Sequence, residues 1–110
     1  MIPIIEQRKA AVVELCRRYR VERLYIFGSA AEDRFDVQRS DLDFLVKMAD
    51  REPTGRYADR VLDFAEALER LFERRVDLVT EESVRNPYFR KEVEATRQLV
   101  YGEPDQEAAA

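Results

Sequence analysis

Three aspartates lie in segments that the sequence predicts to be strands. Asp41 and Asp43 are two positions apart in residues 41–47, where they alternate with apolar residues. Because side chains alternate along a strand, both carboxylates point to the same face. Asp77 interrupts a second apolar run, residues 76–79, although aspartate is normally depleted from strands. If the two strands are neighbours, the three carboxylates converge on one patch and repel one another, which requires a functional reason.

A divalent cation would remove that repulsion. The chain has no histidine and a single cysteine. This excludes Ser-His-Asp and Cys-His catalysis, and it excludes metal sites built from histidine or from clustered cysteines. Only oxygen ligands remain, and oxygen ligands suit Mg²⁺ or Mn²⁺. The expected ligands are Asp41, Asp43 and Asp77.

A glycine-serine pair upstream of these acids could hold a phosphate. Gly28 and Ser29 directly follow the apolar run 24–27, which reads as a buried strand. Glycine permits a close backbone approach, the following amides can bind an anion, and the serine hydroxyl can donate to a phosphate oxygen. Alone, this pair would more often be a plain turn. Beside an acid cluster, it indicates phosphoryl or nucleotidyl transfer assisted by two metal ions.

The elements that must position these residues follow from periodicity and from capping residues. Cys16 lies on the apolar stripe of the first helix and is expected in the core. Thr80 is expected to cap the turn that follows the third strand, and Asn86 and Pro87 look like an N-cap followed by proline at the first helical position. The expected elements are a helix at 3–20, a strand at 24–27, a helical turn at 30–35, a loop at 36–40, a strand at 41–47, a loop at 50–56, a helix at 57–73, a strand at 76–79, a turn from 81 and a helix from 86 to about 100. The fold class is therefore α/β (α+β), with one small mixed β-sheet flanked by helices.

Length and composition limit the chain to one domain. It has 110 residues, of which 45% are hydrophobic, and we expect residues 1–102 to form the domain and 103–110 a flexible tail. The net charge of −4 argues against direct binding to nucleic acid. No apolar run is long enough to span a bilayer, and no signal-peptide core is visible, so a soluble, cytoplasmic protein is expected.

The motifs resemble a known family when they are taken together. Gly28-Ser29, the run from Ser40 through Asp41 and Asp43 to Val46, and the run around Asp77 are similar to the nucleotidyltransferase signature of the DNA polymerase β superfamily. The similarity is greatest to its minimal nucleotidyltransferase branch and covers residues 1–101. It implies a polymerase β-like core with Asp41 and Asp43 on two metal ions. Asp77 would complete the inner metal site and help to activate the attacking hydroxyl, and the Gly-Ser pair would bind the triphosphate.

The resemblance also implies a reaction and a partner. A minimal nucleotidyltransferase of this kind moves AMP from ATP to a hydroxyl and is often the antitoxin of a pair whose toxin is a HEPN-type RNase. The acceptor would then be a tyrosine of the toxin. Two alternatives stay open: a transferase for a small molecule such as an antibiotic, with the pocket built by a dimer, and a non-catalytic antitoxin that neutralises its partner by binding alone.

Other residues have weaker claims to a role at the site. Arg34, Arg39 and Lys47 could contact phosphates, but a plain surface role is favoured for each. Tyr88, Phe89 and Tyr101 are expected to pack the last helix. Few residues remain outside the catalytic core, so the flanking helices are expected to form a protein–protein interface more readily than a closed small-molecule pocket.

Overall fold

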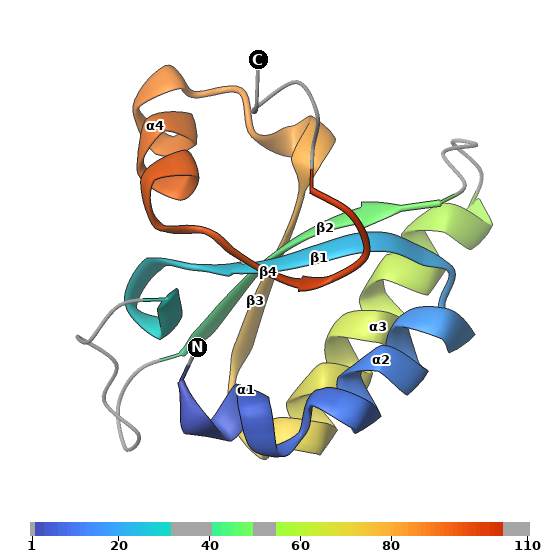
Figure 1. Ribbon diagram of the computed structural model, residues 1–110. Helices are drawn as coiled ribbons and strands as arrows, with labels where there is room; N and C mark the ends of the chain where they lie inside the picture. The colour runs from blue at the N-terminus through green and yellow to red at the C-terminus, as the bar shows by residue number, and fades with distance from the viewer. Residues whose placement is uncertain (1, 32–40, 50–54, 105–110) are drawn as a thin grey trace.

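The computed structural model describes residues 2–31, 41–49 and 55–104 (Figure 1). Arg34, Arg39, Ser40, the predicted loop at 36–40 and most of the loop at 50–56 lie outside the described residues, as does the tail from 105. The elements in chain order are α1 (Pro3–Gln7), α2 (Lys9–Arg18), β1 (Val21–Phe27), the 3₁₀ turn η1 (Gly28–Ala31), β2 (Leu42–Met48), α3 (Gly55–Phe72), β3 (Val76–Thr80), the 3₁₀ turn η2 (Glu81–Ser83), α4 (Pro87–Thr96) and β4 (Gln98–Tyr101).

The strands form one mixed sheet in the order β3-β2-β1-β4. β1 pairs with both β2 and β4 in antiparallel fashion, whereas β2 and β3 are parallel. The parallel pair requires a crossover, and α3 supplies it. The predicted fold class, a small mixed sheet flanked by helices, is confirmed.

The two faces of the sheet carry separate cores, because successive apolar residues along a strand point to opposite faces. Figure 1 shows α2 and α3 on one side of the sheet and α4 on the other. The larger core lies under α1, α2 and α3, and it includes Cys16, Phe44 and Phe64, all of them fully buried. The smaller core lies under α4 and includes Phe27 and Val93. The prediction that Cys16 belongs to the core is confirmed.

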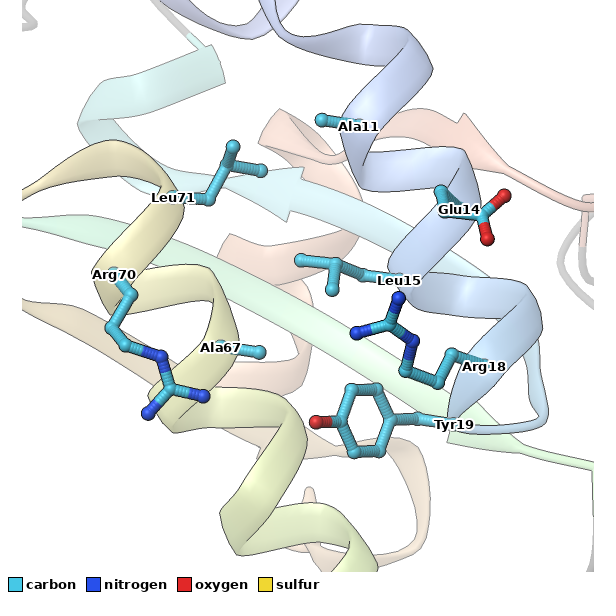
Figure 2. Close-up of a pocket in the computed structure, with 8 residues that line it drawn as sticks. All are labelled: Ala11, Glu14, Leu15, Arg18, Tyr19, Ala67, Arg70 and Leu71. Atoms are coloured by element: carbon cyan, nitrogen blue, oxygen red, sulfur yellow. The ribbon is translucent and has the colours of Figure 1, made fainter.

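A groove of about 400 Å³ separates α2 from α3 on their outer side (Figure 2). Leu15 and Leu71 lie along it, and Arg18 and Arg70 come from the two facing helices. The groove lies on the larger-core side of the sheet, so it is separate from the acidic residues described below.

Two sequence predictions about the helices are wrong. The helix expected at 3–20 is two helices, because Arg8 leaves helical geometry (φ −111°, ψ 14°) between α1 and α2. The last helix does not reach residue 100: Arg97 is extended (φ −60°, ψ 141°), and β4 follows it. The apolar residues of 98–101 continue the helical pattern of α4 in the sequence, but in the fold they pair with β1 as an edge strand.

Of the two predicted caps, Asn86 is confirmed and Thr80 is wrong. The Asn86 side chain accepts hydrogen bonds from the backbone N–H groups of Tyr88 and Phe89, which confirms it as the N-cap of α4. Thr80 makes no side-chain cap hydrogen bond; instead the Ser83 hydroxyl donates to the Thr80 carbonyl oxygen. Tyr88 is also not packed as predicted, since 85% of it is exposed.

The described helices include none that is both long enough and apolar enough to cross a membrane.

Candidate active site

Asp43 and Asp77 lie side by side because their strands are neighbours. In the parallel pairing of β2 with β3, Asp43 is directly in register with Asp77. On its other side, Asp43 is in register with Phe27, the last residue of β1. Alternation places both acids on the α4 side of the sheet, the side to which Leu45 contributes. The convergence that the sequence suggested therefore occurs for these two carboxylates.

Burial and the neighbouring carboxylates change the pKa of Asp43. The pKa of Asp43 is raised from 3.8 to about 6, firstly by burial and then by the charge of Asp77 and a side-chain hydrogen bond with it. The charge of Asp41 adds a smaller contribution in the same direction. Each of these causes disfavours the ionised form. A site that penalises its own negative charge is one that a cation would stabilise.

Asp41 stands apart from this pair. It directly precedes β2 and is half-buried. Among the residues that the structure describes, no three carboxylate, histidine or cysteine side chains come together as a ready-made metal site. Asp41 thus acts on Asp43 through its charge and does not complete a preformed cage. The donor set still fits a hard cation, because it consists of carboxylate oxygens, and the described residues that line the site include no lysine or arginine.

Gly28 brings the turn η1 very close to Asp43. Its backbone is in the left-handed region (φ +68°), and a Cβ atom at this position would lie 2.9 Å from Oδ2 of Asp43. A side chain here would therefore displace the Asp43 carboxylate and would also strain the left-handed backbone. Only glycine avoids both the contact and the strain. The predicted glycine-serine turn after the first strand lies beside the paired acids, with Ser29 as its second residue.

The acids and the turn open into one cavity. Its volume is about 330 Å³. Phe27 and Phe89 form part of its wall and contact each other edge to face, with ring centroids 5.9 Å apart. The cavity is lined by Phe27, Gly28, Asp43, Asp77, Leu78, Val79, Phe89 and Glu92. This arrangement can hold a phosphate group and a cation next to each other against an apolar wall.

Several residues at the site were not found by sequence reasoning. Phe89 and Glu92 reach the cavity from α4, and Thr96 and Gln98 form hydrogen bonds with the turn η1. None carries a local signal, because their role depends on how α4 and β4 return to β1. Lys47, in contrast, lies towards the other end of β2, where its Nζ is 3.0 Å from Oε2 of Glu22 in an ion pair.

Comparison with known proteins matches the chain to a family. The sequence model of the family described as "Nucleotidyltransferase domain" matches residues 9–100. A curated protein of Methanocaldococcus jannaschii, MJ0126, is 34% identical over 88 residues, which is 80% of this chain and 83% of the relative. Its name gives protein adenylyltransferase as a provisional function.

Three solved structures share the fold. One is described as a minimal nucleotidyltransferase, with 31% identity, a TM-score of 0.62, and coverage of 86% of this chain and 90% of that one. A toxin–antitoxin complex with AMP-PNP has 22% identity, a TM-score of 0.68, and coverage of 92% and 77%. The third is a tri-AMPylated HEPN toxin of Shewanella oneidensis in complex with its MNT antitoxin, with 21% identity, a TM-score of 0.58, and coverage of 94% and 76%.

These findings agree with the site. The matched region contains both paired acids and the glycine turn, and the curated relative and the minimal nucleotidyltransferase cover 80% and 86% of the chain. The chain therefore belongs to the nucleotidyltransferase domain family and is a nucleotidyltransferase of the minimal kind.

Proposed function

We propose that the protein transfers AMP from ATP to a hydroxyl of another protein, and that this acceptor is a tyrosine of a cognate HEPN-type RNase toxin. The observation that carries the proposal is the cavity in which the turn at Gly28 meets the in-register pair Asp43 and Asp77. The provisional adenylyltransferase name of the relative and the AMPylated toxin in the neighbouring structure support the same reaction. The AMP-PNP complex supports ATP as the donor.

Asp41, Asp43 and Asp77 are the residues that would hold Mg²⁺, with Mn²⁺ as a substitute. Two such ions, when bound, would neutralise charge on the phosphates and favour attack at the α-phosphorus. Gly28 and Ser29 would hold the triphosphate against the acids. Part of the binding energy of the cation would come from offsetting the burial and the repulsion by Asp77 that raise the pKa of Asp43.

The proposed transfer is a displacement at the α-phosphorus of ATP. The acceptor hydroxyl oxygen forms a bond to the α-phosphorus of ATP while the bond from that phosphorus to the bridging oxygen of the β-phosphate breaks. Pyrophosphate leaves, and the hydroxyl proton passes to the carboxylate of Asp77, which is the more exposed of the two paired acids. The protein contributes position and charge, which supply most of the rate enhancement in phosphoryl-type transfers.

The test is to incubate the protein with ATP, Mg²⁺ and the protein encoded by its neighbouring gene, and to measure intact masses. We expect a gain of one or more AMP units on the neighbour, lost with Asp43→Asn and retained with Asp63→Asn, an exposed acid on α3. Transfer to a small hydroxyl compound with no labelled protein would favour the antibiotic-type alternative. Inhibition of the toxin by Asp43→Asn with no transfer by the native protein would favour neutralisation by binding alone.

A further inference from the structure

The turn η1 is held at both of its ends by side chains from the junction of α4 and β4. The backbone N–H of Gly28, its first residue, donates to Oγ1 of Thr96 at 3.0 Å. The carbonyl oxygen of Ala31, its last residue, accepts from Nε2 of Gln98 at 2.9 Å. These contacts join segments 68 and 67 positions apart in the chain.

The Thr96 hydroxyl is fixed in direction by a second hydrogen bond. It donates its only proton to the carbonyl oxygen of Glu92, at 3.0 Å. Its lone pairs are therefore directed to accept from Gly28, and a side chain without a hydroxyl could make neither contact. The Gly28 amide is thereby held in place by the Thr96 side chain.

The residues around Thr96 strengthen this attachment. Gln98 begins β4 and is in register with Ile26 of β1, two residues before the turn. Between them, the guanidinium of Arg97 lies over the ring of Tyr25, 4.7 Å from its centroid. Three consecutive side chains, at 96, 97 and 98, thus attach the end of α4 to β1 and its turn.

The turn lies very close to the carboxylate of Asp43. A Cβ atom on Gly28 would already lie within 2.9 Å of the Asp43 carboxylate, so a small shift of the turn changes the space between it and the acid pair. We infer that Thr96 and Gln98 are positioning residues, which set the Gly28–Ala31 turn where it can hold the triphosphate next to Asp43 and Asp77. The inference rests on the proposed role of this turn in binding ATP.

The test compares Thr96→Val, which keeps the shape and removes the hydroxyl, with Thr96→Ser, which keeps the hydroxyl. The first readout is hydrogen exchange of the Gly28 amide, followed by NMR. We expect exchange to become at least about tenfold faster in Thr96→Val and to stay near the native rate in Thr96→Ser, because a lost hydrogen bond of this kind is worth roughly a factor of ten.

The second readout is the affinity for ATP in the presence of Mg²⁺, measured by calorimetry without any acceptor. Thr96→Val and Gln98→Met should each bind ATP about tenfold more weakly, whereas Thr96→Ser should stay within about twofold of the native protein. With an acceptor present, KM for ATP should rise while kcat changes little, as for a loss of binding shared by ground and transition states. Ser83→Ala is the control, because it removes a similar hydroxyl contact in η2, which does not line the cavity.

The outcomes separate the inference from the proposed function. Equal Gly28 exchange and equal ATP affinity in Thr96→Val would overturn the inference alone. A uniform loss of stability that Thr96→Ser does not rescue would also overturn it, since the contact would then serve only the fold. Failure of the native protein to bind ATP with Mg²⁺ would instead overturn the proposed function, whatever the exchange of the Gly28 amide.

Discussion

Asp43 should make the metal-free protein sensitive to pH. In the unfolded chain its pKa is the ordinary 3.8, but in the folded protein burial and Asp77 raise the pKa to about 6. Below the lower value the group is protonated in both states. Between the two values only the unfolded chain releases the proton, so stability falls as pH rises and stays low above the higher value. We expect Asp43→Asn to melt higher than the native protein in EDTA near neutral pH, and the difference to vanish near pH ~4.

The control for this prediction is Asp63→Asn, which changes one exposed acid on α3. Addition of Mg²⁺ and ATP should stabilise the native protein and the control but not Asp43→Asn, by linkage of binding to folding. If Asp43→Asn unfolds in EDTA at every pH, Asp43 is a structural hydrogen-bond partner and not a metal ligand.

Cys16 should be inert in the folded protein. It is fully buried in the larger core, and burial raises its pKa to about 12. Since the thiolate is the reactive form, a disulfide reagent should react only on unfolding. The measurement is thiol release with a coloured aromatic disulfide, with and without urea. Rapid reaction in the absence of urea, with no accompanying loss of structure, would show that this core is more open than its packing indicates.

At the scale of the elements, the two left-handed glycines should separate function from stability. Gly28 and Gly102 have φ values of +68° and +86°, so alanine at either costs roughly 1–2 kcal/mol in backbone strain. At Gly102 the new Cβ would also lie 2.2 Å from the Glu22 carbonyl oxygen, a backbone atom, whereas at Gly28 it meets only the movable end of Asp43. Gly102→Ala should therefore lower the melting temperature more, while Gly28→Ala should lose transfer activity. Thermal melts and transfer assays on both variants check this, and the reverse ranking would contradict it.

The elements also show where sequence reasoning succeeds and where it stops. Strong local signals were sufficient for the buried strands and for the start of α4, because Asn86 caps the helix through its own side chain. The end of α4 was missed, since residues 98–101 continue an apolar pattern and only pairing with β1 makes them a strand. The break at Arg8 has no such explanation in the sequence.

The same division applies to the site. Asp43, Asp77 and Gly28 could be predicted to lie together, because each directly follows or interrupts a recognisable strand and the parallel pairing then sets their register. The contacts of Thr96 and Gln98 could not be predicted, as they depend on the return of α4 and β4 to the sheet. Local sequence thus specifies the candidate site residues, and tertiary structure specifies what holds them in place.

At the scale of the whole molecule, the sheet separates the larger core on one side from the candidate site on the other. Helices α1, α2 and α3 bury the larger core on one face, whereas α4 covers only part of the other face and leaves the cavity beside it open. Figure 1 shows α4 standing apart from the other helices, across the sheet. We expect a protein acceptor that reaches Asp77 to lie on the α4 side of the sheet, where the cavity opens.

The two large exposed hydrophobic residues of the described chain test that approach. Tyr88 is 85% exposed on the first turn of α4, next to the cavity residue Phe89, whereas Leu62 is 63% exposed on α3, on the other side of the sheet. Exposed aromatic residues are the usual anchors of protein interfaces. We expect Tyr88→Ala to lower kcat/KM for the toxin about tenfold with unchanged ATP affinity, a loss typical of an interface anchor. Leu62→Ala should change neither quantity. A loss of transfer with Leu62→Ala and none with Tyr88→Ala would place the toxin on α3 and refute docking along α4.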